Sequence, residues 1–267
     1  MQRIVLLLGM GVALVALASC YAFEPRRVLD PLAKPAFEAK VYLGADGSRL
    51  PYRLYVPAGV TQTASLPLLL MLHSITERGD GDGANLAFFQ PEFKEAFYQV
   101  HPCVAVVPQC PAGKYWWDRP VSRDVQGLVR QLARSLPVID TRRFYVTGAS
   151  LGGYGTYALL LVQPHWWAAA VPLCGDPSPM PLDLGLLKDQ PLWIFHGAKD
   201  PRVSVKGDRQ LVARLKALGS AVRYTEYPQE GHRIWTRAYA EPGLWAWVFA
   251  QKKAGPPDLN RPAKWHK

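Results

Sequence analysis

Apolar residues along this chain follow two alternating patterns. Short continuous apolar runs, such as residues 68–72, are typical of strands that are buried on both faces. Apolar residues at three- and four-residue spacing, as in the segment 121–136, predict amphipathic helices instead. The predicted strands are residues 39–43, 50–56, 68–72, 104–107, 144–147, 168–173, 192–195 and 222–227, the first two of which flank an Asp46-Gly47 hairpin turn.

Predicted helices lie between most of these strands and imply an α/β fold. They span residues 85–100, where Pro91 interrupts the pattern, 121–136, 151–161, 203–218, and a last helix from about Pro242. Such alternation predicts a mostly parallel sheet that helices cover on both faces. Ligands bind outside the carboxyl ends of such strands, so the residues that follow each strand are the candidates for function. Only residues 174–191 separate two of the strands, which leaves no room for a large cap domain there.

The N-terminus carries the features of an export signal. Residues 1–19 hold one charged side chain, Arg3, and an apolar run that is only marginally long enough to cross a membrane. The sequence LASC at 17–20 resembles the lipobox of bacterial lipoproteins, in which the signal is cut before the cysteine and that residue is acylated. We therefore expect a lipid anchor at Cys20 and a place in the cell envelope, with Ala22 favouring the outer membrane. A secreted protein and an uncleaved anchor are the alternatives.

The remaining chain has the composition of one large domain between two short extensions. Residues 20–37 contain three prolines and few periodic apolar positions, and are expected to form a linker. The α/β domain is expected at 38–252, and a basic, Pro-rich tail at 253–267. With 49% hydrophobic residues, the chain is long enough to bury a single core.

Charge and cysteine content exclude several classes of function. The net charge of +10 falls to +9 without residues 1–19, but the Lys and Arg residues are scattered and no nucleic-acid-binding motif is present. Cys103, Cys110 and Cys174 are an odd number, so at least one thiol is free or pairs between molecules. Cys103 and Cys110 flank one predicted strand and would lie roughly 20 Å apart, too far for a disulfide. No metal-ligand spacing occurs, and we expect neither a metal nor a cofactor.

The sequence Gly148-Ala149-Ser150-Leu151-Gly152 is the strongest candidate for chemistry. It is a G-x-S-x-G pattern between a predicted strand and a predicted helix, which places the serine hydroxyl on a tight turn above the sheet. The helix N-terminus favours the negative charge that develops during acyl transfer. A Gly-rich turn with a capping serine is the alternative, while a phosphate-binding G-x-x-x-x-G-K-[ST] loop is absent. We therefore predict Ser150 to be a nucleophile.

A serine nucleophile needs a base and an acid, which follow it in this chain order. Asp200 lies in the loop after a predicted strand and is the preferred acid, although it is also a candidate helix N-cap. Asp176 and Asp208 are rival acids. His232 follows the last predicted strand and is the preferred base. His73 and His196 each close a strand, and both are expected to bond to backbone groups rather than to titrate.

These segments together resemble a known family of enzymes. LLLMLHSITERGDG, VVPQCPAGKYWW, FYVTGASLGGYGTY, AAAVPLCGD, LWIFHGAKDPRVSV and YTEYPQEGHRIWTRAYAEPGLWAWVFAQ resemble bacterial α/β-hydrolases. The similar group is the carboxylesterase/phospholipase-like one often labelled predicted peptidases, related to dienelactone hydrolase, polyhydroxybutyrate depolymerase and feruloyl esterase sequences. The resemblance covers about residues 40–250. It implies an α/β-hydrolase fold in which Ser150, Asp200 and His232 form the catalytic triad.

The oxyanion hole is expected to combine two backbone donors. One is the N–H of Leu151, and the other comes from the loop HSITERG at 73–79. The family usually begins this loop with His-Gly-small, whereas this chain has His73-Ser74-Ile75. If the glycine position needs a positive φ, Ser74 would be strained. The N–H of Ile75 is the expected donor, with that of Ser74 as second choice.

The expected activity is hydrolysis of small or carbohydrate-linked carboxylic esters through an acyl-enzyme. The alternatives are a serine peptidase of the prolyl-oligopeptidase type and a non-catalytic surface lipoprotein that retains the fold. Trp116 and Trp117 follow a strand on the same edge and are expected either to form an aromatic wall for the substrate or to pack a loop onto the core. Glu77 and Arg78 are expected to brace the oxyanion loop by a salt bridge or to face solvent.

Overall fold

A single eight-stranded sheet forms the centre of the protein. The structure is a computed structural model that describes residues 36–263, except 62, 90, 179, 181 and 182. The strand order is β1-β2-β4-β3-β5-β6-β7-β8. The strands are β1 (Glu38–Leu43), β2 (Arg49–Tyr55), β3 (Leu66–Leu72), β4 (Val104–Pro108), β5 (Ile139–Ala149), β6 (Trp167–Leu173), β7 (Trp193–Gly197) and β8 (Arg223–Tyr227).

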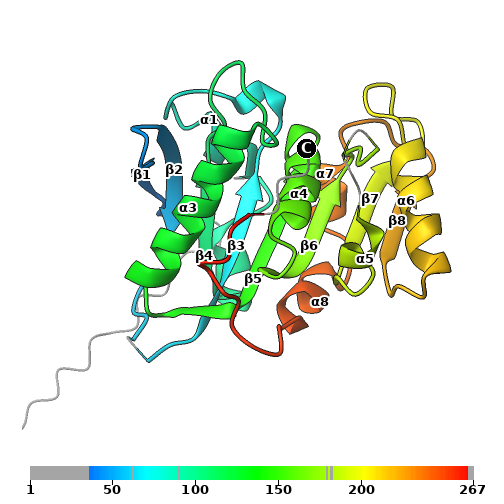
Figure 1. Cartoon of the computed structure of the whole chain (residues 1–267). Coiled ribbons are helices and arrows are strands. Elements are labelled where there is room, and N and C mark those ends of the chain that lie inside the picture. Colours follow the sequence, from blue (N-terminus) through cyan, green and yellow to red (C-terminus); the bar gives the residue numbers. More distant parts are fainter. Residues whose placement is uncertain (1–35, 62, 90, 179, 181–182, 264–267) are drawn as a thin grey trace, which may run out of the picture.

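Strand direction sets the two ends of the molecule. β1 and β2 form an antiparallel hairpin, and β2 is also antiparallel to β4. All pairs from β4 through β3, β5, β6 and β7 to β8 are parallel. The arrowheads of β3 and β6 point to the top of Figure 1, so the loops that follow the parallel strands gather there. The predicted mostly parallel sheet is confirmed.

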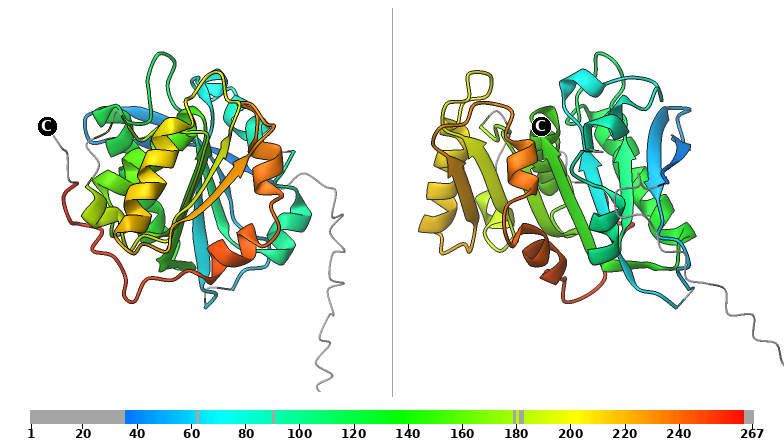
Figure 2. Two further views of the ribbon diagram at one scale, coloured as in Figure 1. Left: turned by 90° about the vertical axis from the view of Figure 1, so that its right-hand side faces the viewer. Right: turned by 180° about the vertical axis from the view of Figure 1, so that it is seen from behind.

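Helices cover both faces of the sheet, as Figure 2 shows in its edge-on view. The α-helices are α1 (Ala84–Phe89), α2 (Glu95–Val100), α3 (Arg119–Ser135), α4 (Leu151–Val162), α5 (Leu184–Leu187), α6 (Lys206–Ala217), α7 (Trp235–Tyr239) and α8 (Leu244–Ala250), and the short 3-10 helix η1 spans Ile75–Glu77. Helices α3, α4, α5 and α6 pack on one face, and α1, α2, α7 and α8 on the other.

The alternation of side chains along each strand builds two cores. In β3, Leu68, Leu70 and Leu72 join the cluster beneath α3 and α4, whereas Leu69 and Met71 join the cluster beneath α2, α7 and α8. All five are essentially inaccessible to solvent. Complete burial of such a side chain contributes about 1.5–3 kcal/mol. The continuous apolar run in the sequence is therefore explained by a strand with a core on each side.

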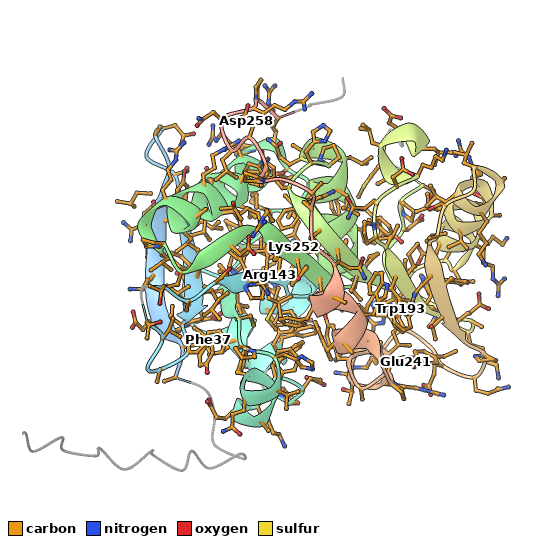
Figure 3. The ribbon with its side chains drawn as sticks, turned by 90° about the horizontal axis from the view of Figure 1, so that it is seen from below. Phe37, Arg143, Trp193, Glu241, Lys252 and Asp258 are labelled. Atoms are coloured by element: carbon orange, nitrogen blue, oxygen red, sulfur yellow. The ribbon has the colours of Figure 1, made fainter. Side chains whose placement is uncertain are left out.

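The amino ends of the parallel strands are closed by charge pairs and by the C-terminal segment. Asp140 of β5 lies 3.0 Å from Arg143 and 3.4 Å from Lys252, which follows α8. Figure 3, a view from below, labels Arg143 and Lys252 close together at this end. The tail then runs along α3, where Arg130 donates to the Leu259 carbonyl at 2.6 Å. The described part of the predicted tail thus lies against the surface of the domain.

Several predicted helix boundaries are wrong. The predicted helix 85–100 is two short helices, because the chain leaves helical geometry around Pro91 before α2 begins at Glu95. Helix α6 begins at Lys206 rather than 203, whereas α8 begins at Leu244, close to the predicted start near Pro242, after Gly243 in a left-handed conformation. The sequence pattern missed α5 and α7, which are only four and five residues long.

The expectations for the N-terminus fall outside this description. Residues 1–19, Cys20 and most of the linker 20–37 precede the described residues. Within residues 36–263, no helix combines the length and apolar character that a membrane crossing requires. Between β6 and β7 the described residues form one short helix, α5.

Candidate active site

The predicted site residues meet above the carboxyl ends of β5, β7 and β8. An open cavity of about 620 Å³ lies there, and Ser150, Leu151, His232, Ser74 and Ile75 contribute to its wall. These residues come from three separate segments of the sequence, at 74–75, 150–151 and 232. Parallel strand direction brings their loops to one edge of the sheet, as the sequence predicted.

Ser150 sits on a strained turn between β5 and α4. Its φ of 56° and ψ of −115° lie outside the regions that a side chain normally favours. The turn is tight because a Cβ atom on Gly152 would lie 1.9 Å from the Leu72 carbonyl oxygen, so only glycine allows α4 to start there. The Ser150 N–H donates to the Leu173 carbonyl at 2.9 Å. The result is a largely buried serine whose hydroxyl reaches the cavity.

A continuous chain of hydrogen bonds connects Ser150, His232 and Asp200. His232 Nε2 lies 2.9 Å from Ser150 Oγ, and His232 Nδ1 lies 2.7 Å from Asp200 Oδ2. With the proton on Nδ1, Nε2 is free to accept the serine proton. The three residues are thus brought together in the arrangement in which a base activates a serine and an acid orients the base.

Asp200 is held as a carboxylate by donors on both of its oxygens. Oδ1 accepts the N–H groups of Arg202 and Val203 at 2.8 and 2.9 Å, and Oδ2 accepts His232. Burial alone would raise the pKa of Asp200, but these hydrogen bonds outweigh it and lower the pKa below its ordinary value. The alternative role of Asp200 as a helix N-cap is wrong, because α6 starts at Lys206 with Val205 as its N-cap, and the bonds of Asp200 to Arg202 and Val203 form a separate turn.

The two rival acids have other partners. Asp176 bonds to the N–H and hydroxyl of Ser178. Asp208 lies on α6, fully buried, and bonds to His196 and Tyr157. Among the residues described, Asp200 is the carboxylate that contacts His232.

Two residues that line the cavity beside Ser150 carry a backbone N–H at the start of a helix. Leu151 is the first residue of α4 and Ile75 the first residue of η1, so neither N–H has an acceptor within its own helix. The Ser74 carbonyl accepts from His73 Nδ1 at 2.6 Å, on the inner side of the loop. Because a trans peptide sets its C=O and N–H in opposite directions, the Ile75 N–H points away from His73. The two residues expected to supply the oxyanion donors, Leu151 and Ile75, thus both belong to the cavity wall.

Ser74 adopts this geometry without strain. Its φ of −78° and ψ of −175° are extended values that any residue accepts. The conditional expectation of strain at Ser74 is therefore not realised, because the loop has no positive φ at this position.

His73 fixes the oxyanion loop as a neutral ring. Its Nε2 accepts the Cys110 N–H at 2.9 Å, so the proton must reside on Nδ1, which donates to the Ser74 carbonyl. Burial lowers the pKa of His73 to about 4. The predicted hydrogen bonds of His73 to backbone groups are confirmed. Through the bond to the Ser74 carbonyl, the ring orients the peptide that carries the Ile75 N–H.

Arg78 braces the same loop, but not by the predicted salt bridge. Its guanidinium donates to the carbonyls of Ile75 and Lys114, both at 3.1 Å. The Glu77 side chain instead accepts from the Thr76 hydroxyl. Arg78 therefore joins the oxyanion loop to the loop that carries the two predicted tryptophans.

The two tryptophans have different roles. Trp116 is 1% exposed, lies in the core and donates from its indole to the His73 carbonyl at 3.1 Å. Its predicted contact with substrate is therefore corrected to a packing role. Trp117 is 39% exposed, lines the cavity, and stacks on Tyr115 with ring centroids 4.7 Å apart.

Sequence reasoning missed part of the cavity wall. Trp235, on the one-turn helix α7, faces His232 with ring centroids 6.1 Å apart and packs against Phe88 at 5.3 Å. Arg202 and Arg233 also line the cavity, each directly after or near a triad residue. The sequence could have indicated these two arginines, because they lie beside Asp200 and His232 in the chain.

One group of metal-ligand type occurs among the described residues. Ligand atoms of Cys174, Asp200 and His232 lie within 4.8 Å of one another. Burial raises the pKa of the Cys174 thiol, whereas metal binding needs a thiolate. Asp200 and His232 are already bonded to each other. The donor set fits a triad better than a metal site.

Comparisons with known proteins agree with this geometry. The model of the prolyl oligopeptidase family matches residues 181–253, the part that carries Asp200 and His232. A crystal structure described as a thermostable esterase is 32% identical, with a TM-score of 0.73, over 81% of this chain and 63% of its own. The predicted α/β-hydrolase fold is thereby confirmed.

Two curated relatives are hydrolases of different bonds. The bifunctional acetylxylan esterase/xylanase XynS20E of Neocallimastix patriciarum is 27% identical over 165 residues, 60% of this chain and 22% of that protein. Dipeptidyl peptidase family member 6 of Caenorhabditis elegans is 28% identical over 161 residues, 46% of this chain and 22% of that protein. The chain therefore spans 22% of the length of each of these curated relatives.

We expect His73→Leu to slow the reaction of Ser150 with a fluorophosphonate reagent by about 10²-fold, the size of effect seen when one oxyanion donor is lost. The variant removes the ring that orients the Ile75 N–H. The rate is measured as the mass increase of the intact protein with time.

His73→Asn and Ser74→Gly are the matched controls for this experiment. Asparagine retains a donor near the position of Nδ1, and Ser74 contributes through its carbonyl, so both variants should react within a few-fold of wild type. Equal rates for His73→Leu and wild type, with both folded by circular dichroism, would contradict the orienting role.

Proposed function

We propose that this α/β-hydrolase is a serine carboxylic-ester hydrolase that acts on small or carbohydrate-linked esters. The observation that carries the proposal is the hydrogen-bonded chain Ser150–His232–Asp200 beside two backbone N–H groups on one open cavity. The esterase among the solved structures and the acetylxylan esterase relative support the same reaction.

The geometry accounts for each step of acyl transfer. Ser150 Oγ attacks the ester carbonyl carbon while His232 Nε2 takes the hydroxyl proton. The N–H groups of Leu151 and Ile75 receive the negative charge on the carbonyl oxygen, and Asp200 holds the imidazolium of His232. Collapse of this intermediate breaks the ester C–O bond, and His232 returns the proton to the leaving alcohol oxygen.

Deacylation reverses the same proton path. Water takes the place of the alcohol and attacks the acyl carbon while His232 Nε2 accepts its proton. A second tetrahedral intermediate then expels Ser150 Oγ, which regains its proton from His232. The products are an alcohol and a carboxylic acid, and the enzyme returns to its starting protonation state.

The shape of the cavity supports accessible rather than deeply enclosed substrates. Tyr115 and Trp117 are each more than a third exposed and form a stacked pair beside Tyr154. Such paired rings offer a flat surface for a sugar or an aromatic group. Trp235 and Phe88 contribute another apolar part of the wall. We propose that the alcohol or acyl group of the substrate packs against the Tyr115–Trp117 pair.

A serine peptidase is the second candidate. It is favoured by the match of residues 181–253 to the prolyl oligopeptidase family and by the dipeptidyl peptidase relative. The triad and oxyanion hole serve both reactions. The leaving group distinguishes them, since an amide nitrogen must be protonated before it departs.

We further propose that the protein is a lipoprotein attached to a cell-envelope membrane through Cys20. The support is the LASC sequence at 17–20 after an apolar run. Several acyl chains on one residue hold a protein at a membrane, whereas one chain binds only weakly.

Ser150→Ala should lower kcat for p-nitrophenyl acetate and butyrate by about 10⁴-fold or more, because the nucleophile is lost. The release of p-nitrophenol is followed by absorbance. Ser74→Ala is the control and should keep near-wild-type turnover. If wild type releases p-nitrophenol no faster than Ser150→Ala, the hydrolase proposal fails. Faster cleavage of a peptide p-nitroanilide than of the esters would favour the peptidase.

Trp117→Ala should lower kcat/KM for an acetylated xylo-oligosaccharide by about tenfold, because it removes one face of the stacked pair. Turnover of p-nitrophenyl acetate, which is too small to span the pair, should change little and serves as the internal control. A parallel loss on both substrates would assign Trp117 to the packing of the loop instead.

Membrane fractions of cells that express the full chain should contain a protein that begins at an acylated Cys20. Intact-mass spectrometry measures the acyl groups, and Cys20→Ser should shift the protein out of the detergent-soluble membrane fraction. A membrane-bound protein with an unmodified Cys20 would contradict the anchor.

A further inference from the structure

A second histidine lies behind the triad acid. His196 ends β7 and is fully buried. Its Nδ1 lies 2.7 Å from Asp208 Oδ2, while its Nε2 lies 3.1 Å from the Val203 carbonyl and 3.3 Å from Asp200 Oδ2. Asp200 Oδ2 therefore stands between two imidazole rings, His232 on the side of the cavity and His196 on the side of the core.

Every group near the ring nitrogens of His196 is an acceptor. A carbonyl has only lone pairs to offer, and a carboxylate likewise accepts. A neutral imidazole has one unprotonated nitrogen. In His196 the lone pair of that nitrogen would face the lone pair of a buried oxygen, which is unfavourable. His73 differs, because its Nε2 accepts a hydrogen bond from the Cys110 N–H and so needs no proton. Because only acceptors contact the two ring nitrogens of His196, the ring is best satisfied when both nitrogens carry a proton.

Asp208 supplies the opposite charge: burial raises its pKa, and the hydrogen bonds from His196 and Tyr157 oppose that shift by favouring the carboxylate. It is fully buried on α6, and its second oxygen accepts the Tyr157 hydroxyl at 2.6 Å. Burial by itself would lower the pKa of His196, but the hydrogen bond to Asp208 and its charge, with Val203 and Asp200, raise that pKa above its ordinary value. A buried ion pair of this kind needs all its remaining positions bonded, and here they are.

We propose that His196 and Asp208 form a buried imidazolium–carboxylate pair that positions the triad acid Asp200, so that the working unit extends from Ser150 through His232 and Asp200 to His196 and Asp208. His196 touches neither the cavity nor the reacting atoms, and is a positioning residue. It acts by holding Asp200 Oδ2 in line with His232 Nδ1.

Loss of the His196 proton has a defined consequence. A neutral ring donates from one nitrogen only, so either Asp208 or the Asp200–Val203 side loses its donor. A group whose pKa is raised on folding stabilises the fold below its unfolded pKa, and this stabilisation is lost as the pH rises through the folded value. Both stability and turnover should therefore fall on the alkaline side. The other charged or titratable groups around the pair are Asp200, His232, Tyr157, Asp176, and Glu226, which Arg209 and Tyr224 bind.

The protonation of His196 is tested directly by nitrogen NMR of the protein labelled with ¹⁵N at histidine. At about pH 8, well above the ordinary pKa of histidine, we expect one ring with both nitrogens protonated. This signal should be absent in His196→Gln and should become that of a neutral ring in Asp208→Asn. A neutral ring at His196 in wild type would overturn the proposal.

The positioning role rests on the proposed ester hydrolysis and is tested by its pH profile. His196→Gln should lower kcat by about 10²-fold, as expected when a catalytic group is slightly misplaced, with little change in KM. The alkaline decline of kcat/KM that we expect in wild type should disappear in this variant. Tyr157→Phe removes one hydrogen bond to Asp208 but keeps both members of the pair, so it should keep the alkaline decline with a smaller loss of kcat.

A double variant and the activity of wild type distinguish failure of the positioning role from failure of the proposed function. The double variant His196→Gln/Asp208→Asn leaves no unpaired buried charge, and it replaces His196→Gln if that variant does not fold. Wild-type kcat together with an unchanged alkaline decline in either variant would overturn the positioning role. If wild type itself hydrolyses no ester, the proposed function is wrong, while the NMR result still decides the state of His196.

Discussion

The tight contact between the start of α4 and the ends of its neighbouring strands controls the rest of the site. Ser150 keeps a backbone conformation that costs about 1–3 kcal/mol, and it does so because the surrounding backbone leaves it no alternative. A Cβ atom on Gly152 would overlap the Leu72 carbonyl oxygen. A Cβ atom on Gly153 would lie 2.4 Å from the Leu173 carbonyl oxygen. The same contact fixes the end of β3, from which the oxyanion loop departs. Ser150 and the loop at 73–79 are thus placed by one packing constraint.

The sequence was sufficient for the triad because each member follows a strand. Ser150, Asp200 and His232 come after β5, β7 and β8, and the carboxyl ends of parallel strands share one edge. Position relative to the predicted elements then favoured Asp200, in the loop after β7, over Asp176, in the loop after β6, and Asp208, which was expected on a helix. The same reasoning was insufficient for Trp116 and Trp117, because the conformation of an irregular loop decides which of two adjacent rings faces the cavity. Short elements such as α7 were missed because one helical turn carries no detectable periodicity.

His73 and His196 illustrate how the same residue at the same kind of position acquires different charge. Both end a strand, and both are completely buried. The sequence around each suggests only a backbone contact. His73 accepts a hydrogen bond from the main-chain N–H of Cys110, which favours the neutral ring. His196 instead meets the carboxylate of Asp208 on α6, which favours the charged ring. This difference arises from tertiary partners 37 and 12 residues away, which no local pattern reveals.

The direction of β1 has a consequence for how the molecule presents its cavity. β1 is antiparallel to β2, and β2 is antiparallel to β4, so β1 starts at the amino ends of the parallel strands. Phe37, just before β1, packs on Tyr55 and Tyr98 at that end, and it is visible in the view from below in Figure 3. The chain therefore enters the domain at the pole opposite to Ser150. The start of the described chain and the mouth of the cavity therefore lie on opposite sides of the domain, and the first strand leaves the approach to Ser150 open.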